Sequence, residues 1–128
     1  MIVYRRSPKL DGSQLNDLFR ASWDGFKKRD FTPVLSQSLG YVAAFDSELL
    51  VGFVNLAWDG CCHAFLLDTT VHPNYRRRGI GTELVSQAVM LAREHTVSWL
   101  HVDFEPRHAE FYRRRGFRPT EAGLMMLD

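Results

Sequence analysis

The amino-acid sequence predicts an α/β (α+β) fold built on a mixed, mostly antiparallel central sheet. Three observations favour this class. Short strand and helix patterns alternate along the chain, three consecutive strand patterns are separated only by tight turns, and a long amphipathic pattern then links two strands. No stretch rich in proline, glycine and serine divides the 128 residues. We therefore expect a single domain over residues 1–128, with six to seven strands and about four flanking helices.

The first forty residues are predicted to hold one strand and two helices. Residues 1–5 have the pattern of a short strand. The run Asp11-Gly12-Ser13 is able to cap a helix whose apolar residues recur at helical spacing. Thr32 followed by Pro33 is typical of an N-cap and a first-turn proline, so a second, short helix is expected there.

The middle of the chain changes from helical to strand periodicity. Residues 41–45 and 49–58, joined by a turn at residues 46–48, predict a β-hairpin. Asp59-Gly60 then turns the chain into a third strand, at residues 61–71. These three strands are expected to form an antiparallel meander.

The last third alternates helix and strand again. Residues 79–95 predict a strongly amphipathic helix, and residues 97–104 are apolar enough for a buried strand. A further helix is expected from Pro106 to Gly116, since proline favours the first turn, glycine follows helix ends, and three arginines precede the glycine. A closing pair of short strands is predicted at residues 117–119 and 123–127.

The charge balance excludes several partners. Lys and Arg number 16 against 15 Asp and Glu, which gives a formal net charge of +1. A nucleic-acid binder needs a larger positive excess, so we expect no nucleic-acid partner. No apolar run approaches the roughly 20 residues that span a bilayer, and the N-terminus lacks the apolar core of a signal peptide, so we expect a cytoplasmic protein without a membrane partner. Cys61 and Cys62 are adjacent, which favours neither a structural disulfide nor a metal site.

The stretch VHPNYRRRGIGT, residues 71–82, is the most informative part of the chain. A strand ends there, a tight turn carries three arginines and two glycines, and a long helix begins. The first N–H groups of a helix have no intrahelical partner and lie at the positive end of the helix dipole, so this junction predicts a site for phosphate or pyrophosphate. Gly79 and Gly81 leave the backbone accessible. The alternative is a tight turn that serves packing alone; neither a Walker P-loop nor a Rossmann fingerprint is present.

Two motifs in this half of the chain resemble those of a known family. The RxxGxG run at residues 76–81, preceded by VxP at 71–73, resembles the acyl-CoA signature of the GNAT superfamily of N-acetyltransferases. Further on, FYRRRGF at residues 111–117 is similar to the second signature of that family. The two motifs stand in the right order on the predicted elements, and the resemblance extends over residues 49–127.

The resemblance implies how acetyl-CoA, as the co-substrate, would be bound. In such proteins the fourth and fifth strands splay apart, the pantetheine arm pairs with backbone groups in the gap, and the pyrophosphate lies on the N–H groups of the following helix. No metal is implied. The cofactor-binding residues that it implies here are Val71, Arg76, Arg77, Arg78, Gly79, Ile80, Gly81 and Thr82.

Acetyl transfer to an amine requires an uncharged nitrogen, a polarised thioester carbonyl and a proton for the leaving thiolate. Tyr112 matches the tyrosine of the family and is implied as the general acid; the alternative is a half-buried aromatic with a purely structural hydroxyl. The general base is open between His101, Asp68, Asp103 and Glu105. Histidine has the most suitable ordinary pKa, whereas the pKa of Asp68 would rise if its carboxyl were buried on an apolar strand.

Glu105 departs from the pattern of many relatives, which carry an asparagine seven residues before the tyrosine. A carboxylate cannot donate the hydrogen bond that an amide can, so Glu105 either is protonated or faces the acceptor amine. The acceptor is expected to be a small-molecule or peptide amine, chosen by the N-terminal strand and helices, and a homodimer is left open. Two other functions are weighed: a non-catalytic acyl-CoA-binding relative, and an interaction module that uses its basic patches.

The N-terminal aromatic residues are open to two interpretations. They either line an apolar acceptor pocket or simply form core. The residues concerned are Trp23, Phe26, Phe31, Phe45 and Trp58.

Overall fold

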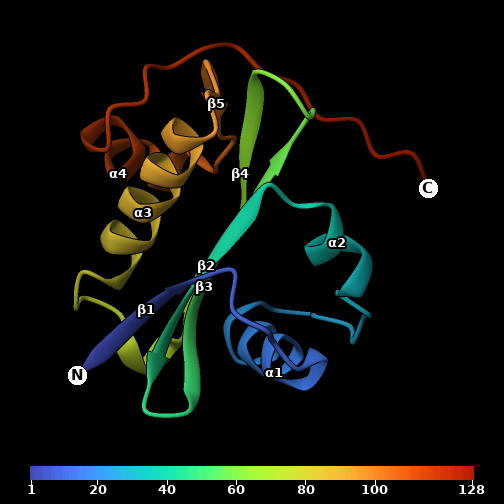
Figure 1. The fold of residues 1–128 in the computed structure, drawn as a ribbon, viewed down its shortest axis with the longest axis vertical. Helices are drawn as coiled ribbons and strands as arrows, with labels where there is room; N and C mark the ends of the chain where they lie inside the picture. Colours follow the sequence, from blue (N-terminus) through green and yellow to red (C-terminus); the bar gives the residue numbers. More distant parts are fainter.

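The computed structural model describes residues 1–128 and has a five-stranded sheet with helices on both faces (Figure 1). The strands are β1 (Ile2–Arg6), β2 (Gly40–Asp46), β3 (Leu49–Trp58), β4 (His63–Val71) and β5 (Trp99–His101). The helices are α1 (Gly12–Ser22), α2 (Thr32–Gln37), α3 (Ile80–Glu94) and α4 (Ala109–Arg114), with single 3₁₀ turns η1 (Pro73–Tyr75) and η2 (Pro106–His108). The predicted α/β class, the antiparallel meander and the four helices are confirmed. No helix is both long and apolar enough to cross a membrane.

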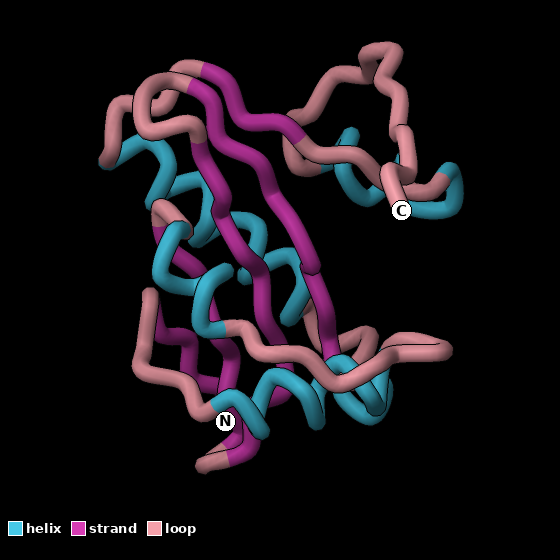
Figure 2. Tube along the Cα trace, turned by 90° about the vertical axis from the view of Figure 1, so that its right-hand side faces the viewer, coloured by secondary structure: helices cyan, strands magenta, loops and turns pink.

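The strand order follows the sequence, β1-β2-β3-β4-β5. Neighbouring strands are antiparallel from β1 to β4, whereas β4 and β5 are parallel because α3 makes the crossover between them. Helices α3 and α4 lie on one face of the sheet and α1 and α2 on the other (Figure 1). Figure 2 views the molecule from the α1–α2 side, with the long strands running behind these helices.

The central strands are buried on both faces, and each face carries its own core. In β2, Val42 and Ala44 pack toward α3, while Ala43 between them packs beneath α1. Neighbouring residues of a strand point to opposite faces, so a continuous apolar run is what a doubly covered strand requires. The core on the α3 face holds that helix, and with it the turn that precedes it, against the sheet.

The start of α1 agrees with its predicted cap, whereas the start of α2 differs from the prediction. The carboxylate of Asp11 accepts the N–H of Ser13 at 2.9 Å and the Gln14 side chain accepts the N–H of Asp11 at 2.8 Å, which completes a capping box. The predicted N-cap role of Thr32 is wrong, because Thr32 is the first residue of α2 and Phe31 holds the cap position without a side-chain bond. Asp30 instead accepts the N–H of Thr32, at 2.9 Å.

The prediction of six to seven strands is wrong in the C-terminal segment. Residues 117–128 form no strand, and in Figure 1 the red chain end runs over the top of the sheet without joining it. Apolar side chains at the end, Leu124 to Leu127, are 82–88% exposed. Strand-forming sequence needs a neighbouring edge to pair with, and β5, three residues long instead of the predicted eight, offers very little.

Candidate functional site

β4 and β5 are joined at one end only. Residues 63–65 of β4 pair with residues 99–101 of β5. Beyond these pairs, β4 and the segment that follows β5 diverge. A cavity of about 240 Å³ opens where they part. It is lined by residues 66–69 of β4, residues 102–104 after β5, His108 of η2 and Tyr112 of α4. The predicted gap between the fourth and fifth strands is therefore present.

A β-bulge in β4 faces this cavity. Asn55 pairs with Leu67 and Phe53 with Thr70, so Asp68 and Thr69 together lie opposite the single residue between Phe53 and Asn55. Asp68 has φ 60°, a left-handed conformation that is costly for a residue with a side chain. A bulge breaks the alternation of the strand and leaves a residue out of the ladder. This bulge therefore sets the direction of Asp68 at the cavity.

The Asp68 carboxyl is unpaired and its ionisation is disfavoured. Burial raises the pKa of Asp68, and the positive charge of Arg29 acts in the opposite direction. The side chain makes no hydrogen bond or ion pair within the chain, although the Asp68 carbonyl accepts the hydroxyl of Thr70 at 2.9 Å. A carboxyl with a raised pKa that lines a cavity is suited to contact a cation or to accept a proton.

Tyr112 enters the same cavity from the opposite side. It is 8% exposed, and its ring stacks on Phe104 at 4.9 Å and meets Phe111 and Phe117 edge-on, at 5.0 and 5.8 Å. Burial raises the pKa of Tyr112; the Thr69 side chain acts against this shift and the charge of Asp103 adds to it. The phenol therefore keeps its proton at neutral pH, as a general acid must.

Two of the other base candidates, His101 and Glu105, lie elsewhere. His101 belongs to the paired end of β5, where its Nε2 is 2.8 Å from Nδ1 of His63 and its ring stacks on Phe65 at 4.5 Å. Glu105 is exposed and forms an ion pair with Arg107 at 3.0 Å. Neither lines the cavity. Of the four candidate bases, the structure brings Asp68 and Asp103 together with Tyr112 in the cavity, and burial raises the pKa of Asp68.

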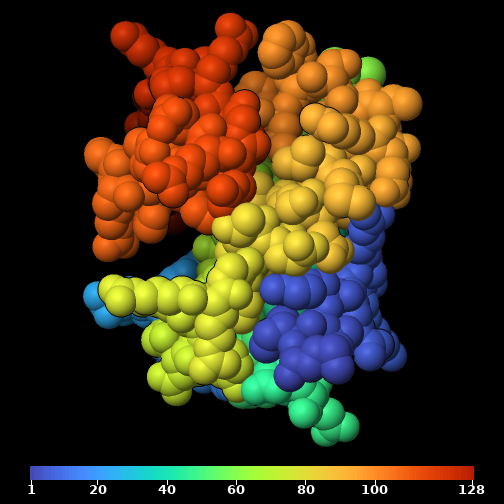
Figure 3. Space-filling model, turned by 90° about the vertical axis from the view of Figure 1, so that its left-hand side faces the viewer, coloured from blue at the N-terminus to red at the C-terminus, as the bar shows by residue number.

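A second cavity, of about 270 Å³, lies at the start of α3. In the space-filling view a notch separates the yellow loop that precedes α3 from the orange-red region of α4 (Figure 3). Of the eight predicted cofactor-binding residues, all but Arg78 line this cavity, together with Tyr75 and Phe111. Arg78 instead lies over the Tyr75 ring, with its guanidinium carbon 4.9 Å from the ring centre.

The two glycines of this loop serve different purposes. Gly79 is the N-cap of α3 at φ 77°, which only glycine adopts freely. A Cβ on Gly81 would meet its nearest neighbours, Val71 and Phe111, at ordinary distances of 3.7 to 3.9 Å. Packing therefore does not require glycine at position 81, and its missing side chain instead leaves room in the cavity. The Arg115 guanidinium donates to the Thr82 hydroxyl at 2.6 Å and ties the end of α4 to the start of α3.

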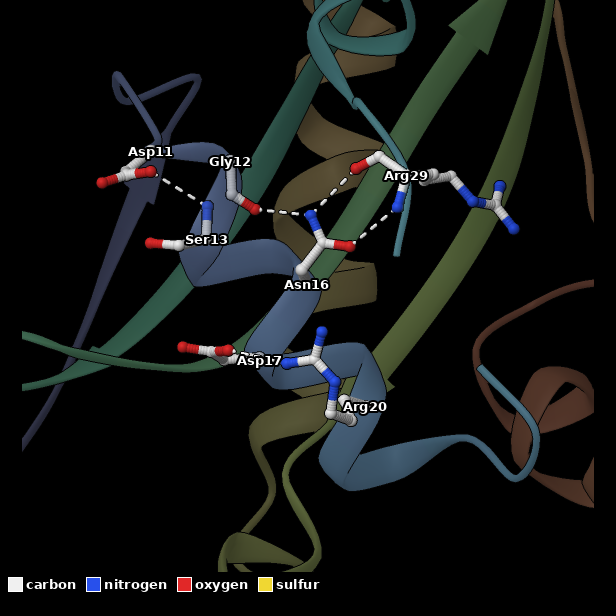
Figure 4. A network of polar contacts seen from close by, with 7 residues as sticks. All are labelled: Asp11, Gly12, Ser13, Asn16, Asp17, Arg20 and Arg29. Carbon is white, nitrogen blue, oxygen red and sulfur yellow. Dashed lines mark hydrogen bonds and ion pairs between the residues drawn. The ribbon is translucent and has the colours of Figure 1, made fainter. Parts of the chain in front are cut away.

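Of the five aromatic residues named above, Phe31 is buried in the core beneath α1, Trp23, Phe26 and Phe45 are partly buried against that core, and Trp58 is partly buried against the core on the α3 face. Phe19 stacks on Trp23 at 4.2 Å and meets Phe31 and Phe53 edge-on, at 5.2 and 5.9 Å. The sequence analysis missed a polar feature beside this cluster, the contact between Asn16 and Arg29 (Figure 4). Its signal in the sequence is a single asparagine among the apolar residues of α1, where a buried amide demands hydrogen-bond partners.

Residues 12–117 match the family model described as Acetyltransferase (GNAT) family. The chain belongs to the GNAT acetyltransferase family. The mycothiol acetyltransferase of Mycolicibacterium vanbaalenii is 34% identical over 73 residues, which are 57% of this chain and 24% of that protein. An uncharacterized N-acetyltransferase of Porphyra purpurea is 31% identical over 78 residues, or 61% of this chain and 45% of that protein. The chain thus spans less than half the length of these curated relatives.

Solved GNAT structures share the fold. A GNAT family acetyltransferase from Streptococcus pneumoniae TIGR4 superposes with a TM-score of 0.81 at 26% identity, over 100% of this chain and 98% of that one. The aminoglycoside N-acetyltransferase AAC(6′)-Iy, solved in complex with CoA, superposes with a TM-score of 0.78 at 17% identity, over 100% of this chain and 95% of that one. The second likeness concerns the fold alone.

Proposed function

We propose that this GNAT chain is an acetyl-CoA-dependent N-acetyltransferase, which transfers the acetyl group to a primary amine by direct attack in a ternary complex. The observation that carries the proposal is the placement of Asp68 and Tyr112 in one cavity, between strands that diverge toward the helix-start loop of α3. The proposal treats residues 1–128 as one catalytic domain and assigns no role to a metal.

The second cavity suits the nucleotide end of acetyl-CoA. The N–H groups of residues 77–82 would hold the pyrophosphate at the positive end of α3, with Arg76 and Arg77 adding charge. Backbone groups near Val71, at the end of β4, would pair with the pantetheine arm, because β5 does not extend far enough to occupy them. When bound there, acetyl-CoA supplies the thioester that makes the acetyl group transferable.

Asp68 and Tyr112 divide the proton transfers between them. Asp68 accepts a proton from the acceptor nitrogen as the nitrogen bonds to the acetyl carbonyl carbon, and its raised pKa makes it a stronger base than an ordinary aspartate. Tyr112 gives its phenolic proton to the sulfur as the carbon–sulfur bond breaks. Proton exchange with water resets both groups, so the net reaction converts an amine and a thioester into an amide and a thiol.

The test has two arms. Calorimetry with acetyl-CoA measures binding, and release of free thiol with a panel of small-molecule and peptide amines measures transfer. We expect binding and amine-dependent thiol release. Binding without release by any amine would favour the non-catalytic acyl-CoA-binding relative, a role for which the exposed Glu105 at the usual asparagine position is the motivating observation. No binding at millimolar acetyl-CoA would overturn both readings.

A further inference from the structure

Arg29, in the segment between α1 and α2, is a cation without a charged partner. Its guanidinium carbon lies 5.5 Å from the centre of the Phe31 ring and 6.0 Å from that of Phe26. The side chain takes part in none of the ion pairs of the chain and forms no hydrogen bond. Aromatic faces attract a guanidinium but do not use its N–H groups, so the donors of Arg29 remain free.

The backbone of Arg29 is fixed by a buried amide. Asn16 of α1 is 4% exposed; its Nδ2 donates to the Arg29 carbonyl at 2.9 Å and its Oδ1 accepts the Arg29 N–H at 2.9 Å. A further bond from Nδ2 to the Gly12 carbonyl, at 2.8 Å, fixes the amide itself. These bonds attach the loop to α1 at Arg29. They are made to the backbone of Arg29, so they do not require an arginine side chain at this position.

The Arg29 side chain extends toward the strand that carries Asp68. In Figure 4 it leaves Asn16 and reaches over the neighbouring strand of the sheet. The positive charge of Arg29 acts to lower the pKa of the Asp68 carboxyl, and the two groups form no ion pair. The cavity thus presents one unpaired carboxyl, and one unpaired guanidinium, which is not part of the cavity lining, extends over the sheet from the segment before α2.

We propose that the acceptor is an amine that also carries an anionic group, and that Arg29 binds the anion while Asp68 meets the amine. A guanidinium offers parallel N–H donors that match the oxygens of a carboxylate or a phosphate. A ligand that carries both charges pairs with Arg29 and with Asp68. A purely cationic amine is instead repelled by Arg29. This inference rests on the proposed function.

The experiment compares matched acceptors by thiol release. An amino acid is set against its amide, an aminoalkyl phosphate against the alkylamine that lacks the phosphate, and kcat and KM are measured for each. We expect kcat/KM to be about tenfold or more higher for at least one anionic acceptor, which is the effect of one charge-assisted contact at an exposed site. The amino acid and the phosphate arms distinguish which anion Arg29 binds. Equal rates for charged and neutral partners would overturn the inference.

Variants at position 29 locate the effect. Arg29→Gln is expected to raise KM for the anionic acceptor about tenfold while leaving kcat and acetyl-CoA affinity unchanged, and Arg29→Lys to restore part of the loss. Lys28→Gln, which removes the adjacent exposed charge, is the matched control and is expected to keep the preference. An Arg29→Gln enzyme that retains the preference contradicts the proposal.

The two proposals fail in different ways. If no amine releases thiol from acetyl-CoA, the proposed transferase function fails. If thiol is released but neutral amines are used as well as anionic ones, only the inference about the acceptor fails. Arg29→Gln keeps the backbone groups that bind Asn16, so thermal unfolding is expected to show an unchanged fold and to separate loss of binding from loss of structure.

Discussion

The two cavities of this GNAT chain are built in contrasting ways. The cavity at the start of α3 is formed largely by one continuous stretch of chain, and its proposed contacts are backbone N–H groups. The cavity between β4 and β5 gathers side chains from positions far apart in the sequence, Asp68 on a bulge and Tyr112 on α4. A single substitution other than by proline removes a side chain but leaves the backbone N–H group in place. Substitutions are therefore expected to have larger effects at the cavity between β4 and β5 than at the cavity before α3.

The strongest expected effect is that of Tyr112→Phe. Removal of the hydroxyl that protonates the thiolate is expected to lower kcat about a hundredfold, the usual contribution of a general acid, with acetyl-CoA affinity unchanged by calorimetry. Tyr41→Phe is the matched control, because its partly buried hydroxyl donates to the Pro8 carbonyl at 2.6 Å, outside either cavity. An unchanged rate in Tyr112→Phe would leave the tyrosine a structural aromatic.

Asp68→Asn is expected to lower kcat by about tenfold to a hundredfold while leaving the fold as stable as before or more so. Burial raises the pKa of Asp68 above its unfolded value, so its contribution to stability is fully present below the ordinary aspartate pKa of 3.8 and is lost as the pH rises through the folded-state pKa. Thermal unfolding should therefore favour the variant at neutral pH, and this advantage should vanish in acid. A variant less stable than wild type at neutral pH would contradict this account.

Arg77→Glu is expected to weaken acetyl-CoA binding about tenfold, because charge reversal at an exposed position beside the phosphates is partly screened by salt. Titration calorimetry at low and high salt measures the effect, which should shrink as salt is added. Lys9→Glu makes the same change of net charge on a loop away from both cavities and is expected to leave affinity unchanged. Equal affinities of Arg77→Glu and Lys9→Glu would remove the phosphate site from this loop.

The smallest effect is expected for Gly81→Ala. Alanine gains up to about 1 kcal/mol of helix propensity over glycine, and its Cβ meets no close neighbour, so the melting temperature should stay the same or rise. The methyl group occupies the second cavity, and acetyl-CoA affinity should fall about fivefold. Unaltered affinity would indicate that the pyrophosphate lies elsewhere.

The same contrast explains what could be predicted from the sequence. The loop before α3 was predictable because its glycines, arginines and helix start are consecutive, and all but Arg78 of the expected residues line the cavity. The gap between β4 and β5 followed from the family resemblance. Which of the candidate bases line the cavity with Tyr112 was not predictable, because this depends on where the β4 ladder gains a residue and where β5 ends.

Other differences between the sequence predictions and the structure have the same cause, because they depend on residues that are far apart in the sequence. The apolar run at residues 123–127 has strand-like composition, but a strand also needs an edge that sequence alone does not locate. Arg29 belongs to a run of exposed charges, and only the bonds from Asn16, thirteen residues earlier, single it out. The N-terminal region to which Arg29 belongs is also where the sequence predicts that the acceptor is chosen.

The ladder between β4 and β5 is short and lies at the narrow end of the opening between them. Three residue pairs and the contact between His63 and His101, at 2.8 Å, join the strands there, while residues 102–104 extend unpaired for about 10 Å beyond. A rotation of about 10° at this paired end moves the far end of that segment by about 2 Å over this length. A small rotation at the paired end would therefore change the width of the opening, although residues 63–65 and 99–101 do not line it.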